Sequence, residues 1–563
     1  MRTIHKRIRK ATSTPKGRII FFSILLLILS VIAAGLLYWN FYKKQIIRTQ
    51  LESAIKEKSK GLYSVKYDSL YLDEVAGDLS AKNFRLTYDS NKYLALLREG
   101  DVPPTLLTIT IPSLNVAGVK TPRALLSKEI VGKKLQINDP VIDIFYTHAG
   151  KDSTRNAPTK EVYEQILGDL NLIHIDTVFI SNATITTRDL RTGVKKVQMM
   201  NTNIQLVNVA VDSAGDADTS RILFAKEVTI NVAKIAWSPE KSYDYNLDSV
   251  SLSTISKSVH IGAFQVRPLQ DELTFTRSLR LAADRFDFSV NKIDIKNIDF
   301  YQLSREELIA DSIVVNSASF KIYRDISLPH DRISRIGTYP SQAVMRSSLP
   351  MNVRSIIFNN TFVEYKERNA KTGQAGKVQF YNTRATVSNV TNKPELVKEN
   401  NVMVVDAVSR FLDKAPLHAN WKFYLGSPNG RFDLRGSLGA IDATQVNVLT
   451  VPMGPARIER GVIHSLQFNL AANDYSMSGK VTMLYDDLRV SILQKDEDTK
   501  IVKKKQLASL AANVMIKNSN PSGNKEEPRV IDAKFQRDTH RSMFHMTWKT
   551  IFKGVKESVG INK

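Results

Sequence analysis

The chain has 563 residues, of which 43% are hydrophobic and 24% charged, and it contains no cysteine. This composition excludes global disorder, and the lack of cysteine excludes disulfides, cysteine-ligated zinc, iron–sulfur clusters and thiol catalysis. The net charge of +23 gathers at the ends: residues 1–44 carry nine Lys and Arg and no acid, and residues 500–563 carry fourteen against five acids. Basic ends on a nearly neutral body favour contact with anionic membranes rather than nucleic acid.

The segment 19–39 carries no charge and ends in Tyr38 and Trp39. Twenty-one residues of helix span about 30 Å, the thickness of a bilayer core, and aromatic residues suit its interface. Seven Lys and Arg precede the segment in the tail 1–18. They predict a single-pass anchor in the inner (cytoplasmic) membrane, with a cytoplasmic N-terminus and a periplasmic bulk. The run is longer than the core of a signal peptide and bulky residues follow Gly35, so we expect no cleavage.

Beyond a polar juxtamembrane helix at 40–60, apolar and polar residues alternate in many short runs separated by turn residues. Such alternation is typical of strands with one apolar face. The sequence therefore predicts a mainly β protein with few helices, whose elongated, curved antiparallel sheet forms a groove. Further along the chain we expect a helix or linker at 394–414, a C-terminal β section at 415–495 and a basic tail at 496–563.

The chain also matches itself at a nearly constant offset. Residues 68–72 resemble 248–252, residues 180–185 resemble 358–363, and residues 197–202 resemble 378–383. The offsets lie between 178 and 181 residues and the matches are collinear. They predict two copies of one β unit, at 61–240 and 241–393, whose stacking would bury a continuous apolar face.

The order of these features resembles the AsmA-like family. The resemblance rests on the anchor, on the runs Val65–Leu70 and Gly77–Leu86, on Leu125–Tyr146, and on Gly461–Ile492 with its Tyr485-Asp486-Asp487-Leu488 ending. It implies a bacterial envelope protein of the bridge-like lipid-transfer kind, with a long curved sheet around an apolar trough. The implied partners are phospholipids, the inner membrane and outer-membrane or other envelope proteins.

Alternating strands need a cover for their apolar face, and two alternatives remain open. In the first, lipid acyl chains fill the trough, and the protein takes part in phospholipid transport and outer-membrane homeostasis. In the second, a closed protein core makes the chain a structural or chaperone-like scaffold that assists the assembly of outer-membrane proteins. The candidate groove residues are apolar and predicted to face inward: Leu79, Ile109, Ile111, Ile175, Phe288, Ile295, Phe432 and Phe468.

Between residues 539 and 560, apolar residues recur at helical spacing opposite a basic side. This predicts an amphipathic helix that docks on an anionic membrane or a partner, or alternatively packs on the protein's own β core. The predicted contact residues are Phe544, Trp548, Ile551, Phe552, Val555, Lys549 and Lys553.

The sequence contains no recognisable catalytic motif. The nine His are scattered, and adjacent acids such as Asp486 and Asp487 would point to opposite faces of a strand. GxSxG, HExxH, Walker and GxGxxG elements are absent from the sequence. We therefore expect no enzymatic activity, no cofactor and no metal site.

Overall fold

The computed structural model describes residues 59, 61–73, 75–99, 105–120, 129–147, 172–212, 220–240, 242–370, 372–453, 456–495, 502–504, 516–523 and 526–561. The predicted tail 1–18, the anchor 19–39 and, apart from Ser59, the juxtamembrane helix 40–60 lie outside these ranges. In the described part of the chain, no helix is both long and apolar enough to cross a membrane.

The protein is mainly β, with a large mixed sheet and few helices. It divides into two compact units, which are described separately below. Unit 1 comprises the described residues up to Gly262 together with Asn297–Glu307, and unit 2 comprises Ala263–Lys296 and Leu308 onwards. Strand β11 (Ser258–Pro268) contains the division between them.

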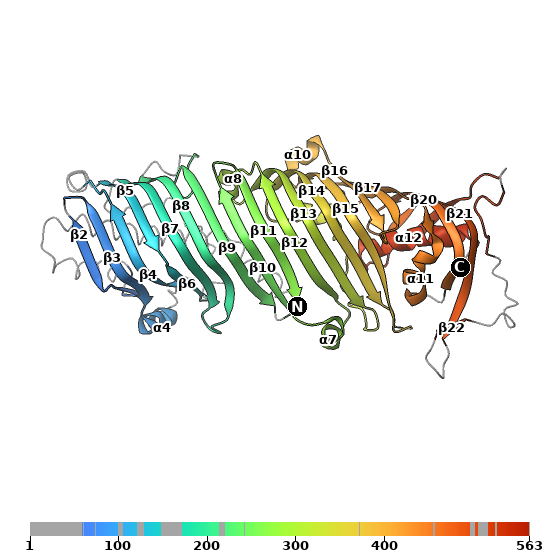
Figure 1. Ribbon diagram of the computed structural model, residues 1–563, viewed down its shortest axis with the longest axis horizontal. Coiled ribbons are helices and arrows are strands. Elements are labelled where there is room, and N and C mark those ends of the chain that lie inside the picture. The colour runs from blue at the N-terminus through green and yellow to red at the C-terminus, as the bar shows by residue number, and fades with distance from the viewer. Residues whose placement is uncertain are drawn as a thin grey trace. The chain divides into compact units, whose positions relative to one another are not determined.

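The strands of unit 1 lie side by side nearly in chain order (Figure 1). Strands β1 and β2 both pair with β3, β3 pairs with β4, β4 with β5 and β6, both of these with β7, and then β8, β9 and β10 follow. The elements are β1 (Tyr63–Lys66), β2 (Ser69–Asp73), β3 (Asp78–Tyr88), α4 (Ser90–Glu99), β4 (Thr105–Ala117), β5 (Glu129–Asn138), β6 (Val141–Tyr146), β7 (Leu172–Asp189), β8 (Lys195–Asp212), β9 (Glu227–Glu240), β10 (Tyr243–Ser253) and α8 (Phe300–Ser304).

Unit 2 continues the same kind of sheet from β12 through β18 to β20, β21 and β23. Its strands are β12 (Asp284–Lys296), β13 (Leu308–Asp325), β14 (Met351–Arg368), β15 (Ala375–Thr391), β16 (Val402–Phe411), β17 (Ala415–Tyr424), β18 (Phe432–Leu438), β19 (Ile441–Asp442), β20 (Ala456–Ala472), β21 (Ser476–Lys495), β22 (Val502–Lys504) and β23 (Val530–Gln536). Its helices are α7 (Glu272–Arg277), α9 (Pro340–Met345), α10 (Pro394–Glu399), η1 (Ala443–Val446), α11 (Asn447–Met453) and α12 (Met543–Ser558).

The predicted purely antiparallel sheet is wrong, because each unit contains a parallel pairing. Strands β5 and β6 run parallel to β7, and β13 runs parallel to β14. A parallel pair needs a crossover connection rather than a hairpin. In unit 2 this crossover is the long segment 326–350, which includes α9.

The strand pairing repeats at the offset that the sequence shows. Strands β13, β14 and β15 begin 179, 179 and 180 residues after β5, β7 and β8. In both parallel pairings a residue faces the one 43 positions later, as Glu129 faces Leu172 and Leu308 faces Met351. Identical order and register in two places indicate that the two segments fold by the same local rules.

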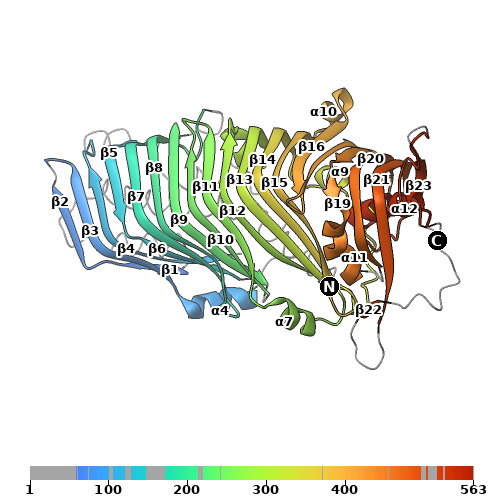
Figure 2. The same cartoon turned by 45° about the vertical axis from the view of Figure 1, so that its right-hand side comes forward.

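Left-handed residues interrupt the long strands at equivalent positions. In unit 1 they are Asp139, Asn182, Asn201 and Asn208, and in unit 2 they are Ser317, Asn360, Asn382 and Asn389, all with φ between 49° and 62°. Asn and Asp tolerate this conformation better than most residues, and the irregularity bends a strand. The strands of each unit accordingly curve along their length (Figure 2).

Three predicted boundaries need correction. The expected helix or linker at 394–414 is a short helix, α10, followed by strand β16. The expected basic tail 496–563 contributes β23, which pairs with β21 and belongs to the sheet of unit 2. The amphipathic helix expected at 539–560 is α12, which begins at Met543 because the Ser542 side chain caps its N-terminus.

Candidate functional site

Each unit has one sheet face that carries its apolar side chains, which we call the inner face. In β8 the buried residues Ile204 and Leu206 precede left-handed Asn208, and Val209 and Val211 follow it. The change from even to odd numbers keeps all four side chains in one cluster, because the left-handed residue reverses the alternation. The inner face therefore stays apolar on both sides of the bend.

The inner face of unit 1 holds four of the predicted groove residues. Leu79, Ile109, Ile111 and Ile175 are between 1% and 6% exposed and belong to a single cluster of buried side chains. Members of this cluster come from strands β1 and β3–β9 and from Ala225, and none comes from a described helix. The structure thus brings these four residues together from three strands.

The inner face of unit 2 carries a row of phenylalanines on three neighbouring strands. The ring of Phe320 on β13 lies edge-to-face with Phe288 on β12, at 5.3 Å between centroids, and with Phe358 on β14, at 6.4 Å. All three side chains are partly exposed. We call them the phenylalanine row; only Phe288 was predicted, and predicted Ile295 is partly exposed on the same face opposite Ile313.

The row occupies positions that correspond to buried residues of unit 1. Phe288 faces Phe320 across β12 and β13 as Ile109 faces Ile142 across β4 and β6. In unit 1 these positions hold fully buried isoleucines, whereas in unit 2 they hold partly exposed phenylalanines. The sequence offset of 178 or 179 residues between the pairs was the signal that could have found Phe320.

The remaining two predicted groove residues lie elsewhere. Phe432 is fully buried between the rings of Tyr339 and Phe423, each 5.3 Å away, and Phe468 belongs to the same cluster. Protein side chains from α9 and α12 fill this cluster. Phe432 and Phe468 are therefore core residues, and the prediction that they contact lipid does not fit their surroundings.

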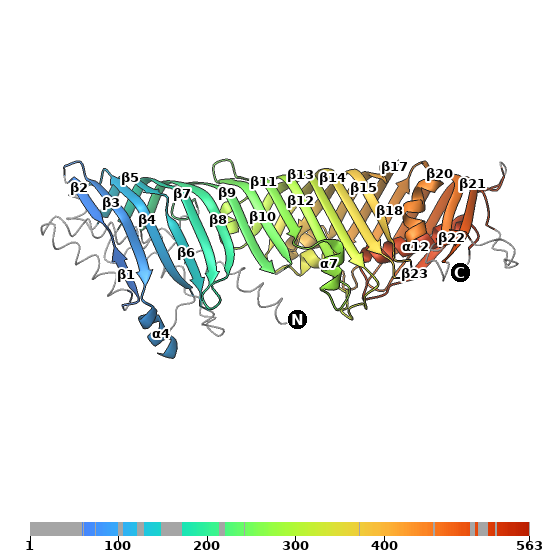
Figure 3. The same cartoon turned by 60° about the horizontal axis from the view of Figure 1, so that its bottom comes forward.

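Helix α12 packs against β21 and β23 through its small residues, not through its large apolar ones (Figure 3). Its buried positions are Met546, Thr550, Gly554 and Ser558. A Cβ atom at Gly554 would lie 2.5 Å from the Cβ of Val481, so glycine allows this close approach. Of the two alternatives weighed for this helix, packing on the protein's own sheet is the one observed.

The residues predicted to contact a membrane lie on the flanks of α12. Trp548 stacks on Phe552 at 5.8 Å, and Phe544, which is 37% exposed, contacts Tyr365 of β14 at 5.5 Å. Ile551 and Val555 pack partly into neighbouring clusters. Lys549 is exposed, and Lys553 donates a hydrogen bond to the Lys534 carbonyl oxygen.

Polar groups gather where the inner face of unit 2 ends. Arg324 faces Asp284 in the strand register and donates to its carboxylate at 3.0 Å. Nearby, the Tyr365 hydroxyl donates to Glu367 at 2.7 Å, and burial raises the pKa of Tyr365 well above its usual value. Burial also lowers the pKa of His545 to about 4, aided by Arg541 and Lys549. These groups close the apolar row at one end.

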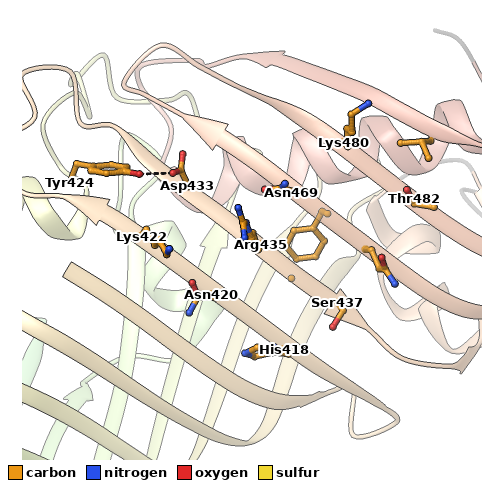
Figure 4. Close-up of a pocket in the computed structure, with 14 residues that line it drawn as sticks. His418, Asn420, Lys422, Tyr424, Asp433, Arg435, Ser437, Asn469, Lys480 and Thr482 are labelled. Carbon is orange, nitrogen blue, oxygen red and sulfur yellow. Dashed lines mark hydrogen bonds between the residues drawn. The ribbon is translucent and has the colours of Figure 1, made fainter. Parts of the chain in front are cut away.

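The opposite face of unit 2 contains a polar depression of about 1070 Å³ (Figure 4). It lies over strands β17, β18, β20 and β21 and the start of β23. Its lining residues are His418, Asn420, Lys422, Tyr424, Asp433, Arg435, Gly436, Ser437, Gln467, Phe468, Asn469, Lys480, Thr482 and Val530. The sequence analysis missed this depression because its residues are ordinary outward-facing polar positions of separate strands.

No group of three or more His, Asp or Glu residues is placed to hold a metal ion in the ranges that the structure describes. The chain matches no protein-family model, and it matches none of the curated proteins.

Proposed function

We propose that this chain is an inner-membrane-anchored envelope protein that holds lipid acyl chains against its inner faces. It would take part in phospholipid transport and outer-membrane homeostasis, as the resemblance to AsmA-like proteins implies. The proposed partners are phospholipids, the inner membrane and other envelope proteins. The predicted anchor and the basic ends of the sequence support this placement.

The observation that carries the proposal is the partly exposed phenylalanine row. Three aromatic side chains on adjacent strands give water an apolar strip that crosses the strands. Exposed contiguous apolar surface is unfavourable unless something covers it, and such patches mark binding surfaces. Each methylene of an acyl chain buried there would contribute about 0.8 kcal/mol.

An acyl chain fits this strip better than a ligand with many polar groups. Around the row, the partly buried neighbours are apolar: Phe264, Ile293 and Ile313 join it in one cluster. Binding through dispersion and apolar burial alone is tolerant of chain length and head group, as bulk lipid transport requires. The polar groups around Arg324 at the end of the face leave the hydrocarbon tail to the row and the polar head to water.

A second candidate, the scaffold with a closed core, is favoured by the burial in unit 1. Leu106, Leu114 and Val211 are fully buried there, as in a packed protein interior. On this account the inner face has a protein cover and binds no lipid. The two candidates differ in what they predict for the partly exposed face of unit 2.

The test is a matched pair of substitutions on β13, read by mass spectrometry of lipids that co-purify with the full-length protein. Phe320→Asp places a charge within the phenylalanine row, and Ser319→Asp places the same charge at the adjacent position on the opposite face. We expect lipid to co-purify with the parent protein and with Ser319→Asp, but much less with Phe320→Asp. A parent protein that carries no lipid, or Phe320→Asp protein that unfolds as a core variant would, favours the scaffold.

A further inference from the structure

The polar depression of unit 2 is built as a regular grid of side chains. In the strand register Asn420 faces Arg435, Arg435 faces Asn469, and Asn469 faces Lys480. The next row brings His418, Ser437, Gln467 and Thr482 into line. Cross-strand neighbours lie about 5 Å apart, so one ligand can contact both rows.

Positive charge dominates this surface. Its lining includes Lys422, Arg435 and Lys480 but a single carboxylate, Asp433. Asp433 already accepts a hydrogen bond from the Tyr424 hydroxyl at 2.7 Å, which raises the pKa of that tyrosine. Among the described residues, Lys422 and Arg435 have no carboxylate within ion-pair distance, and Lys480 has only exposed Asp532 at 3.5 Å.

The uncharged lining consists mostly of hydrogen-bonding groups. Amides come from Asn420, Gln467 and Asn469, and hydroxyls from Ser437 and Thr482. Asn420 donates to Asp406 at 3.2 Å, which leaves its carbonyl oxygen as an acceptor. Paired donors and acceptors of this kind match the hydroxyl groups of a sugar, whereas a guanidinium fork matches a phosphate.

From this arrangement we propose that the depression binds a phosphate-bearing oligosaccharide. The phosphate pairs with Arg435 and Lys422, and the sugar hydroxyls bond to the amide and hydroxyl side chains of the two rows. The volume of about 1070 Å³ is at the upper limit of ordinary ligand pockets and suits several sugar rings rather than one. This site faces away from the inner face and does not depend on lipid binding there.

The proposal is tested by titration calorimetry of the full-length protein in detergent with mannotriose that carries one phosphate. We expect Arg435→Gln to weaken binding at least about tenfold, since one charge-assisted interaction is lost. Lys321→Gln, which removes an exposed charge from β13 outside the depression, should leave the affinity unchanged. Raising the salt concentration should weaken binding of the parent protein.

Two further ligands separate sugar recognition from simple charge attraction. Unphosphorylated mannotriose and inorganic phosphate should each bind at least about tenfold more weakly than the phosphorylated sugar. Equal binding of inorganic phosphate, equal binding of the neutral sugar, or an unchanged affinity of Arg435→Gln would each overturn the proposal. So would binding to phosphatidylinositol vesicles without binding to the free phosphorylated sugar.

Discussion

The Asn182 side chain donates a hydrogen bond of 2.7 Å to the Asp139 carboxylate, and both residues are left-handed. They lie side by side where β7 runs parallel to β5 and β6. The same relationship recurs 178 residues later, where the Asn360 side chain donates to the Ser317 hydroxyl at 3.4 Å. The bend of the sheet is thus written twice in the sequence.

The bend predicts a stability cost at Asn182. Asn182→Ala removes the hydrogen bond to Asp139 and places a less tolerant residue at φ 55°, which we expect to destabilise the protein by about 1–2 kcal/mol. Asn182→Gly removes the hydrogen bond but relieves the backbone, so its loss should be smaller. Urea unfolding measures both; an alanine variant as stable as the parent would show that the bend does not depend on this residue.

Helix α12 should be sensitive to the size of residue 554. Alanine favours a helix over glycine by about 1 kcal/mol, but its Cβ would clash with Val481. We expect the clash to prevail and Gly554→Ala to destabilise unit 2 by about 1–3 kcal/mol. Lys549→Ala, an exposed position on the same helix, should be nearly neutral. Stabilisation of the Gly554→Ala protein in thermal unfolding would contradict the close packing.

The buried pair of Arg537 and Asp474 should be costly to break on one side. Their side chains are 0% and 3% exposed, their charged atoms are 3.5 Å apart, and Arg537 also lies over the Tyr339 ring at 4.6 Å. Arg537→Met would leave Asp474 buried and unpaired, at a cost of about 3–5 kcal/mol. Adding Asp474→Leu should restore part of this loss. If the double variant is no more stable than the single one in urea unfolding, the two residues are not energetically coupled.

Acid should weaken unit 2 through His545. Burial lowers the folded-state pKa of His545 from 6.5 to about 4, with Arg541, Lys549 and His330 adding to the effect and Asp538 opposing it. The unfolded state therefore binds the proton more readily, so the stability that neutral His545 contributes is complete above about pH 6.5 and is lost as the pH falls towards 4. Because carboxylates titrate in the same range, the measurement is a comparison: between pH 7 and 4.5, His545→Phe should lose less stability than the parent. Parallel losses would exclude this residue as the cause.

The alternation of apolar residues was enough to predict the β class and the inner positions Leu79, Ile109, Ile111 and Ile175. It failed where its period breaks: left-handed residues such as Asn208 shift the inward positions from even to odd, and a strict period of two cannot follow them. The parallel pairings were missed because crossover connections have no local sequence signal. The offset of the repeat, by contrast, carried the strand order.

Tertiary packing decided the remaining differences. Gly554 and its small neighbours on α12 fit closely against β21, which a scale of hydrophobicity ranks below Phe544 and Trp548. Phe432 shows the alternation of a groove residue, but Tyr339 from the crossover segment covers it. Contacts between segments about one hundred residues apart are not visible in local patterns.

The most direct test of lipid binding is photo-crosslinking from the phenylalanine row. The full-length protein would carry p-benzoylphenylalanine in place of Phe288, and in a matched variant in place of Ser289, its neighbour on the opposite face of β12. After irradiation in cells, mass spectrometry of the purified protein reports what is attached. Our account predicts a covalent phospholipid adduct at position 288 and none at 289; no lipid adduct at 288, with cross-links only to protein, would contradict it.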